Sequence, residues 1–349
     1  VWSRAVGYLL DQQRDDGSWF VKSRSKPFQK YFETGFPHRE DQFISTTATA
    51  WATIALLHSL PKQEPAKITP LADTKPLDWP EADLSYRLMD TAHTFVETQI
   101  KKANDARKPV RGDGKDTEAR RQELATILGV SAEDRLPPRM EYFGTSDDPA
   151  LVAENDDYQI LQVRWPVIAN ITGEGLLIRQ RENTRGRVVV VPDADQTPEQ
   201  QLGPIARRLA DNGFDVVVMS VVSRNKLQTD DRRIQRADYT QREWIYRQAF
   251  HMGRHLIGYE IQRVLAAVDW FRSQADNESK IGIVGYGEGG LIALHAAALD
   301  DRIDATLVSG YFDDSDTAWR EPIYRNVWSR LKHFGNAEVA SLVAPRRLL

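Results

Sequence analysis

The stretch with the clearest chemical potential reads KIGIVGYGEGGL and covers residues 280–291. An apolar strand pattern passes directly into a helical pattern, through a turn with glycine at 285, 287, 289 and 290. A turn of the form G-x-Nu-x-G exposes a nucleophile for acyl transfer at the end of a strand, because its small residues let strand and helix approach closely. Gly285, Gly287 and Gly290 also fit G-x-G-x-x-G, the spacing of a phosphate-binding turn.

Two features argue against a bound dinucleotide at this turn. The turn follows a late strand of its series, whereas dinucleotide-binding folds use the first strand. Glu288 would also place a carboxylate against the pyrophosphate. We therefore interpret the segment as a nucleophile-type elbow and expect no cofactor.

The position of the nucleophile in this elbow falls on Gly287, when Gly285 and Gly289 are taken as the flanking glycines. Glycine adopts the positive φ of an elbow apex without strain but supplies no side chain. Glu288 would serve as a carboxylate nucleophile or general base if the turn shifted by one residue. That shift would put Tyr286 where a small residue is required.

Acidic residues follow another apolar run, at 188–191, which is typical of a strand covered on both faces. The loop that follows contains Asp193, Ala194 and Asp195, and its backbone amides are candidate donors to an oxyanion formed at the elbow. Its amides could donate, but two carboxylates would raise the energy of a developing oxyanion. Alternatively, Asp195 or Thr197 caps the helix that begins at Pro198.

Further polar side chains follow the strands of this region: Asp313, Asp314, Asp316, Ser220 and Ser309. Asp313 is a candidate for the acid of a catalytic triad, and the alternative is a polar loop with a helix cap. The serines are candidate surrogate nucleophiles or ordinary polar groups at strand ends.

Histidines at 251 and 255 lie four residues apart on a predicted helix, with Glu260 nearby in the sequence. This spacing invites a metal site, but there is no H-E-x-x-H pattern and no clear third ligand. We expect no metal here and interpret His251 and His255 as surface or packing residues. His295 falls inside the helix after the elbow, which indicates a core or interface position.

The elements around the elbow alternate between strand and helix, which predicts a parallel sheet with right-handed crossovers. The predicted strands are 188–191, 216–222, 281–284 and 306–308, with helices at 198–212, 257–268 and 289–299. Before them, strands at 158–165, 167–171 and 176–180, with a turn at 172–175, predict an antiparallel meander. A charged insertion follows residue 222.

Residues 118–349 resemble the α/β-hydrolase superfamily, in particular its dienelactone hydrolase and acetyl xylan esterase-like branches. The resemblance rests on the strand order, the elbow, and the runs 188–195, 198–199, 267–270, 296–300 and 344–346. It implies hydrolysis of esters or lactones without a cofactor. It also implies Ser or Cys at the elbow and an oxyanion donor in the loop with Asp193, Ala194 and Asp195. It further implies an acid after a later strand and a histidine after the last one, which we expect beyond Leu349. This chain departs from that pattern at Gly287.

Residues 1–60 are helical in pattern and resemble one QW repeat of terpenoid cyclases and prenyltransferases, which build α-toroids. The resemblance rests on Arg4, Ala5, Tyr8, Gln12 and the Gly17-x-Trp19 turn. In that family these residues tie helix ends together, and the acidic DxDD motif that protonates substrates is absent here. A second helix at 45–60 is apolar nearly all round. It should therefore be buried on several sides, by neighbours upstream of Val1.

Three segments follow from these patterns: an α-toroid repeat fragment at 1–60, a Pro-rich linker and helix at 61–117, and an incomplete hydrolase-like domain at 118–349. The linker holds five prolines, at 61, 65, 70, 76 and 80. The chain starts on Val1 and stops on what reads as a new strand, so we expect a fragment of a longer polypeptide. The fold class predicted is α/β: antiparallel strands, then parallel βαβ units, truncated at the carboxyl end and preceded by the helical fragment.

Composition excludes several classes of function. The 349 residues carry 46 Lys and Arg against 50 Asp and Glu, a net charge of −4 that favours neither nucleic acid nor an anionic membrane as partner. No apolar run approaches a membrane span. With no Cys, the chain has no disulfide, cysteine nucleophile or thiolate metal site. Compartment and oligomeric state stay open, although polysaccharide-related relatives favour an extracytoplasmic setting.

Two functions from different classes remain. The first is an ester-hydrolase-like enzyme acting on a small-molecule or glycan ester through some other nucleophile. The second is an inactive hydrolase-fold module for binding or scaffolding, which recognises a glycan or Ca²⁺ through carboxylates gathered at the strand ends. Those carboxylates would be Asp193, Asp195, Glu288 and Asp313.

Overall fold

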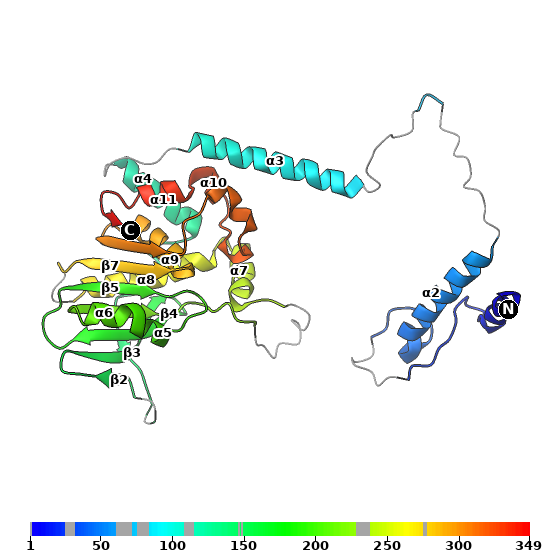
Figure 1. The fold of residues 1–349 in the computed structure, drawn as a ribbon, viewed down its shortest axis with the longest axis horizontal. Coiled ribbons are helices and arrows are strands. Elements are labelled where there is room, and N and C mark those ends of the chain that lie inside the picture. Colours follow the sequence, from blue (N-terminus) through cyan, green and yellow to red (C-terminus); the bar gives the residue numbers. More distant parts are fainter. Residues whose placement is uncertain are drawn as a thin grey trace. The chain divides into compact units, whose positions relative to one another are not determined.

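The computed structural model describes residues 2–24, 32–60, 72–74, 84–107, 115–145, 147, 149–227, 238–274 and 278–349. The chain forms two compact units, residues 1–82 and residues 83–349 (Figure 1). The five prolines of the predicted linker lie outside the described residues. The two units are taken separately below.

The first unit contains two helices, α1 (Trp2–Gln12) and α2 (Gln42–Ser59), with a short 3-10 turn η1 (Arg39–Asp41) before α2. Trp19 is buried between the helices. Its indole Nε1 donates to the carbonyl of Leu9, 2.8 Å away, and its backbone N–H donates to Thr49 Oγ1 at 3.0 Å. Trp19 therefore holds the end of α1 against α2. The cyclase-like character of this repeat stays a prediction.

The expected burial of α2 on several sides is not seen in the described chain. Only Gln42, Ser45 and Ala52 of this helix are buried. Trp51 is 67% exposed and Leu57 is 60% exposed. α2 therefore presents an apolar surface that the described residues of its own unit are too few to cover.

The second unit is built on a mixed sheet, which has nine strands in the described part of the chain. The strands are β1 (Glu141–Tyr142), β2 (Leu151–Glu154), β3 (Tyr158–Ile168), β4 (Ile171–Gln180), β5 (Gly186–Val191), β6 (Phe214–Met219), β7 (Ile281–Tyr286), β8 (Ala305–Ser309) and β9 (Arg347–Leu348). They lie in the order β1-β3-β4-β6-β5-β7-β8-β9, and β2 pairs with β3. Pairing is antiparallel up to β4–β6 and parallel from β6–β5 onward. The predicted fold class, antiparallel strands followed by parallel βαβ units, is confirmed.

Helices cover both faces of this sheet (Figure 1). They are α3 (Leu84–Ala106), α4 (Lys115–Leu128), α5 (Pro198–Gln201), the π-turn η2 (Leu202–Ala206), α6 (Arg207–Ala210), α7 (Gln241–His251), α8 (Leu256–Arg272), α9 (Glu288–Leu299), the 3-10 turns η4 (Ser315–Arg320) and η5 (Ile323–Arg325), α10 (Arg330–His333) and α11 (Asn336–Ser341). α3, which the sequence placed beside the linker, contacts α10 and η4. α7 lies in the predicted charged insertion. None of the described helices combines the length and apolar character needed to cross a bilayer.

The valine run of β5 shows how the two faces are filled. Val189 and Val191 belong to the main core, together with α4, α8, α9 and α11. Val188 and Val190 belong to a second core, which packs against η2 and α6. Because successive side chains of a strand point to opposite faces, a continuous apolar run is what a strand covered on both sides requires.

The predicted meander needs one correction. Segment 167–171 is not a strand of its own, because Val167 and Ile168 end β3 and Ile171 begins β4. Residues 172–175 are not a turn, because β4 runs unbroken from Ile171 to Gln180. The chain reverses just before β4, where Asn170 has a φ of 64°. A Cβ on Gly173 would lie 2.1 Å from Cε2 of Trp165, and one on Gly175 would lie 2.1 Å from the carbonyl oxygen of Val218. These glycines therefore permit close packing within the sheet.

We expect Gly173→Ala to lower the free energy of unfolding by about 1–3 kcal/mol, because the buried Trp165 indole must move to admit the new methyl group. Gly282→Ala in β7 is the matched control, since its Cβ would meet no atom closer than 3.7 Å. That control should stay within about 0.5 kcal/mol of the parent protein. Denaturant titration of both variants measures the difference, and equal losses would contradict the packing explanation.

Candidate functional site

The elbow has Gly287 at its apex, between the end of β7 and the start of α9. Gly287 has φ 58° and ψ −119°, a conformation that side-chain-bearing residues adopt only with strain. Its N–H donates to the carbonyl of Ser309 at 2.9 Å. A Cβ on Gly285 would lie 2.0 Å from the carbonyl oxygen of Gly289, and one on Gly289 would lie 2.0 Å from that of Val191. The glycines therefore let β7, α9 and β5 meet closely.

The register of the elbow leaves Glu288 just past the apex. Tyr286 closes β7 and is 47% exposed, while Glu288 is the first residue of α9 and its side chain is 1% exposed. The one-residue shift that would bring Glu288 to the apex is therefore not what the structure shows. Gly290 packs one step further on, where a Cβ would lie 2.8 Å from the carbonyl oxygen of Ser309.

The space above Gly287 is filled by the carboxylate of Asp193. A Cβ on Gly287 would lie 2.4 Å from Asp193 Oδ1 and 2.5 Å from its Cγ. The same Oδ1 accepts a hydrogen bond from the backbone N–H of Glu288 at 2.8 Å. The amide after the apex is one of the donors that stabilise an oxyanion in acyl transfer. Asp193 thus fills the space that the side chain of a nucleophile at residue 287 would enter. It also accepts the Glu288 N–H that would otherwise stabilise the oxyanion.

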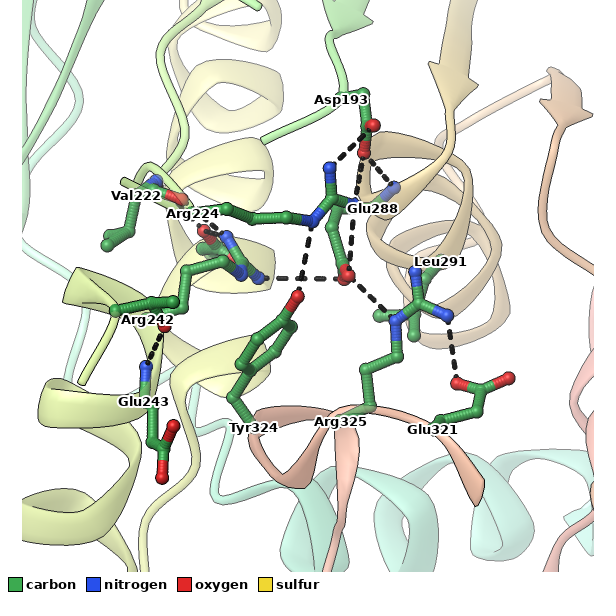
Figure 2. A network of polar contacts seen from close by, with 12 residues as sticks. Asp193, Val222, Arg224, Arg242, Glu243, Glu288, Leu291, Glu321, Tyr324 and Arg325 are labelled. Atoms are coloured by element: carbon green, nitrogen blue, oxygen red, sulfur yellow. Dashed lines mark hydrogen bonds and ion pairs between the residues drawn. The ribbon is translucent and has the colours of Figure 1, made fainter. Parts of the chain in front are cut away.

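Arg224 holds the Asp193 carboxylate in place with two parallel hydrogen bonds, Nη1 to Oδ2 and Nη2 to Oδ1, each 2.7 Å long (Figure 2). Nη1 also donates to Asp195 Oδ2 at 2.9 Å, and Nε donates to the Tyr324 hydroxyl at 3.1 Å. Burial raises the pKa of Asp193, but the hydrogen bonds from Arg224 and the Glu288 N–H outweigh it and leave that pKa below its usual value. Asp193 is therefore ionised at neutral pH.

Glu288 is held by three arginines. Its Oε1 accepts from Arg325 Nε at 2.7 Å and from Arg224 Nη2 at 3.3 Å, and its Oε2 lies 3.6 Å from Arg242 Nη2 (Figure 2). Arg242 in turn forms a fully buried pair with Glu260, with hydrogen bonds of 2.7 and 2.8 Å. Burial alone would lower the pKa of Arg242. The neighbouring Glu260 and Glu288 carboxylates outweigh this effect and leave that pKa above its usual value, so the guanidinium stays charged.

These side chains form one arginine–carboxylate network, made of Asp193, Asp195, Arg224, Arg242, Glu260, Glu288 and Arg325. Four of its members follow neighbouring strands of the order β6-β5-β7: Arg224 after β6, Asp193 and Asp195 after β5, and Glu288 after β7. The carboxyl ends of parallel strands meet at one edge of a sheet, where open α/β folds place their ligands. α7, α8 and η5 supply the other members from the helical layer.

Comparison with known proteins identifies the fold that carries this network. Residues 174–317 match the model of the dienelactone hydrolase family. A protein of Bacteroides fragilis NCTC 9343, provisionally described as an acetyl xylan esterase, superposes with a TM-score of 0.57 at 12% sequence identity, covering 74% of each chain. The fold is that of the α/β-hydrolases. YtaP of Bacillus subtilis strain 168, provisionally named a hydrolase, is 34% identical over 109 residues. That match covers 29% of this chain and 36% of the length of YtaP.

The α/β-hydrolase fold brings together three of the four predicted strand-end carboxylates, Asp193, Asp195 and Glu288. Asp313 does not take part in the network. Its carboxylate accepts from the Asp314 N–H at 2.8 Å, and its carbonyl accepts from Asn336 Nδ2 at 2.9 Å. The prediction that Asp313 joins the other carboxylates is therefore wrong, since its loop turns toward α11.

The alternative readings of the loops as helix caps are confirmed for Thr197 and Asp314. Thr197 stands at the N-cap of α5, and its backbone N–H donates to Oε1 of Gln200 at 2.9 Å. Asp314 caps η4 by accepting from the Asp316 N–H at 3.0 Å. Asp195 makes no such cap and turns to Arg224 instead. Ala194, between Asp193 and Asp195 in the sequence, is buried, and its carbonyl accepts the backbone N–H of Arg224 at 3.4 Å.

The histidines show no sign of a metal site. His251 ends α7 on the surface, His255 is buried before α8, and Glu260 is taken by Arg242. Across the described ranges, no three His, Cys, Asp or Glu side chains are arranged to hold a metal ion. His295 is buried in α9 with Nδ1 2.8 Å from the carbonyl oxygen of Leu291. Burial lowers the pKa of His295 to about 3, so it is a neutral core residue at physiological pH.

The two candidate nucleophiles Ser220 and Ser309 form hydrogen bonds through their backbone atoms. Ser309 accepts the Gly287 N–H, and the Ser220 N–H donates to the carbonyl of Glu174 at 2.8 Å. Sequence reasoning missed the three arginines and Tyr324. Arg224 had a usable signal, since it follows β6 at the same sheet edge as Asp193. Arg242 and Arg325 had none, because Arg242 lies in the predicted charged insertion and no element was predicted around Arg325.

We expect Gly287→Ala to destabilise the protein through two separable causes. The positive φ costs about 1–3 kcal/mol with any side chain. The Asp193 carboxylate, 2.4 Å from the new methyl group, must also move. In an Asp193→Ala background only the first cause remains. A double-mutant cycle measured by denaturant titration should therefore show a coupling of at least about 1 kcal/mol. Additive losses would show that Asp193 does not fill the apex.

We expect Arg242→Leu to cost about 3–5 kcal/mol, because it leaves Glu260 charged and buried without its partner. Arg242→Leu/Glu260→Gln should recover much of this loss, since the amide oxygen can still accept the Val222 N–H that now lies 3.1 Å from Glu260 Oε1. Arg247→Leu, on the exposed face of α7, serves as the control and should change stability little. Similar losses from Arg242→Leu and Arg247→Leu would contradict a buried network.

Proposed function

We propose that this α/β-hydrolase domain is a non-hydrolytic module, whose elbow binds a ligand where related folds cleave an ester. The observation that carries the proposal is the position of the Asp193 carboxylate. It fills the space next to Gly287 and accepts the N–H that an oxyanion would need. Acyl transfer requires a nucleophile and free oxyanion donors at the same point. At this elbow, both requirements are unmet.

The carboxylates of the site are poor replacements for a serine. Asp193 has a lowered pKa and binds three N–H groups, so its oxygens are weakly basic and already engaged. Glu288 is buried and contacts three arginines. An activated nucleophile instead needs an adjacent base and an open path to the substrate. These contacts favour binding over covalent chemistry.

The ligand we propose is a small molecule or a glycan that carries an ester or the acid derived from it. The likeness to a protein described as an acetyl xylan esterase supports this class through the fold alone. Recognition of Ca²⁺ through the strand-end carboxylates has less support, because arginines already pair with Asp193, Asp195 and Glu288. Ester hydrolysis remains the competing function, favoured by the match to the dienelactone hydrolase family.

Hydrolysis of p-nitrophenyl acetate by the full chain tests this proposal. We expect the rate with the wild-type protein to equal that of buffer containing the same amount of denatured protein. Glu288→Gln and Asp193→Asn should leave that background unchanged. Saturable turnover that either substitution abolishes would instead establish an enzyme that uses a carboxylate of the network.

A further inference from the structure

The Asp193 carboxylate is bound at the elbow as a ligand would be. Its two oxygens receive two N–H groups from Arg224 and one from the Glu288 backbone, at 2.7, 2.7 and 2.8 Å. We call these donors, the Arg224 guanidinium and the Glu288 N–H, the cradle. The cradle is built by the ends of β6 and β7, whereas Asp193 enters it from the loop after β5. Donor groups and bound carboxylate thus come from different segments of the chain.

The chemistry of the cradle matches a planar monoanion. A guanidinium fork gives two parallel hydrogen bonds to a carboxylate, and the N–H at the start of the 12-residue helix α9 adds a third from a positive helix end. Asp195 Oδ2, 2.9 Å from Arg224 Nη1, and Glu288 Oε1, 3.3 Å from Arg224 Nη2, are also in contact with the fork. These two carboxylates repel a dianion more than a monoanion, so phosphate is disfavoured.

We propose that Asp193 is an internal ligand that closes the cradle, and that the carboxylate of an external ligand takes its place when the Asp193 side chain turns out to solvent. The proposal rests on the non-hydrolytic function above and names the group of the ligand that this site recognises. The ligand is a monocarboxylate, such as the acid part of an ester related to those that the fold's hydrolases cleave.

The exchange is physically reasonable because it replaces one carboxylate by another. Arg224 keeps its bidentate partner and the Glu288 N–H keeps an acceptor, so no buried charge is left unpaired. Both partners reach solvent already, since the side chain of Asp193 is 19% exposed and that of Arg224 is 24% exposed. Asp193 needs only to rotate away from the elbow, and the absence of a side chain at Gly287 leaves the vacated space open.

The closed arrangement also leaves one acceptor of the network unsatisfied. Glu288 Oε2 is buried and accepts no hydrogen bond from the residues that the structure describes. Its nearest charged neighbour is Arg242 Nη2, 3.6 Å away. Buried polar atoms without partners are rare in folded proteins and call for an explanation. The carboxylate that carries this unpaired atom borders the cradle, since its other oxygen, Oε1, lies 3.3 Å from Arg224 Nη2.

Competition with Asp193 sets the affinity that an external carboxylate can show. If the cradle is open in about 1–10% of molecules, the apparent Kd of the ligand is raised about 10- to 100-fold over its intrinsic value. Removing the Asp193 carboxylate should lift this penalty. The proposal therefore predicts a gain in affinity on removing a charged residue from the site.

Titration with sodium acetate tests the proposal on the full chain, with sodium chloride at equal ionic strength as the reference. In Asp193→Ala, acetate should raise the melting temperature saturably, with an apparent Kd at least about tenfold below that of the wild-type protein. Asp193→Ala/Arg224→Leu should lose the response, since the guanidinium is gone. Inorganic phosphate should stabilise Asp193→Ala less than acetate does.

Two matched variants separate this proposal from a merely unpaired arginine. Asp193→Asn leaves only a neutral amide oxygen as acceptor in the cradle, so its apparent Kd for acetate should lie between those of the wild-type protein and Asp193→Ala. Asp195→Ala removes the other aspartate of Arg224 but leaves Asp193 in place, so it should also behave as wild type. An acetate response in Asp195→Ala equal to that in Asp193→Ala would overturn the proposal.

Failure of Asp193→Ala to fold would not end the test. Asp193→Ser shortens the same side chain and is measured alongside. A variant that folds only in acetate supports the proposal, and one that acetate does not rescue contradicts it. Ester turnover by the wild-type protein would refute the non-hydrolytic function instead, and it is measured independently of acetate binding.

Discussion

The site depends on one contact, in which the carboxylate of Asp193 lies against the backbone of Gly287. This approach is possible only because residue 287 has no side chain, as a Cβ there would lie 2.4 Å from Asp193 Oδ1. The absent nucleophile and the inserted carboxylate are therefore one structural feature. Because the Asp193 carboxylate fills the space next to Gly287, a serine side chain at residue 287 would not fit there unless Asp193 moved.

Such a carboxylate can lie at a buried edge of the sheet only if its charge is compensated. Burying an ion costs several kcal/mol, which is recovered only where geometry is good and further hydrogen bonds are formed. Arg224 meets this condition for Asp193 through two parallel hydrogen bonds. Arg242 meets it in the same way for the fully buried Glu260. Because these arginines come from the β6 loop and α7, the network also ties the helical layer to the elbow.

Local sequence patterns were sufficient to predict those elements whose burial or turn geometry depends on neighbouring residues in the sequence. The valine run of β5, the strand-to-helix turn at Gly287 and the strand ends carrying Asp193 and Glu288 were all predictable. Glycines 173 and 175 misled the prediction, since a glycine required by a neighbouring indole or carbonyl looks the same in sequence as one in a turn. The arginines were missed because their contacts with the carboxylates of the network span 18 to 64 residues and follow from the tertiary arrangement of the strands and helices.

The elbow of an α/β-hydrolase combines two parts that this chain separates. One is the backbone, with a positive φ at the apex and an N–H directed at the site from the residue after it, and this part is complete at Gly287 and Glu288. The other is the side chain that attacks the substrate, which is missing. The backbone part alone can bind a negatively charged group, and in this structure the Glu288 N–H binds the Asp193 carboxylate. Because fold does not determine activity, the retained backbone part supports the proposal that this domain binds an anion without cleaving it.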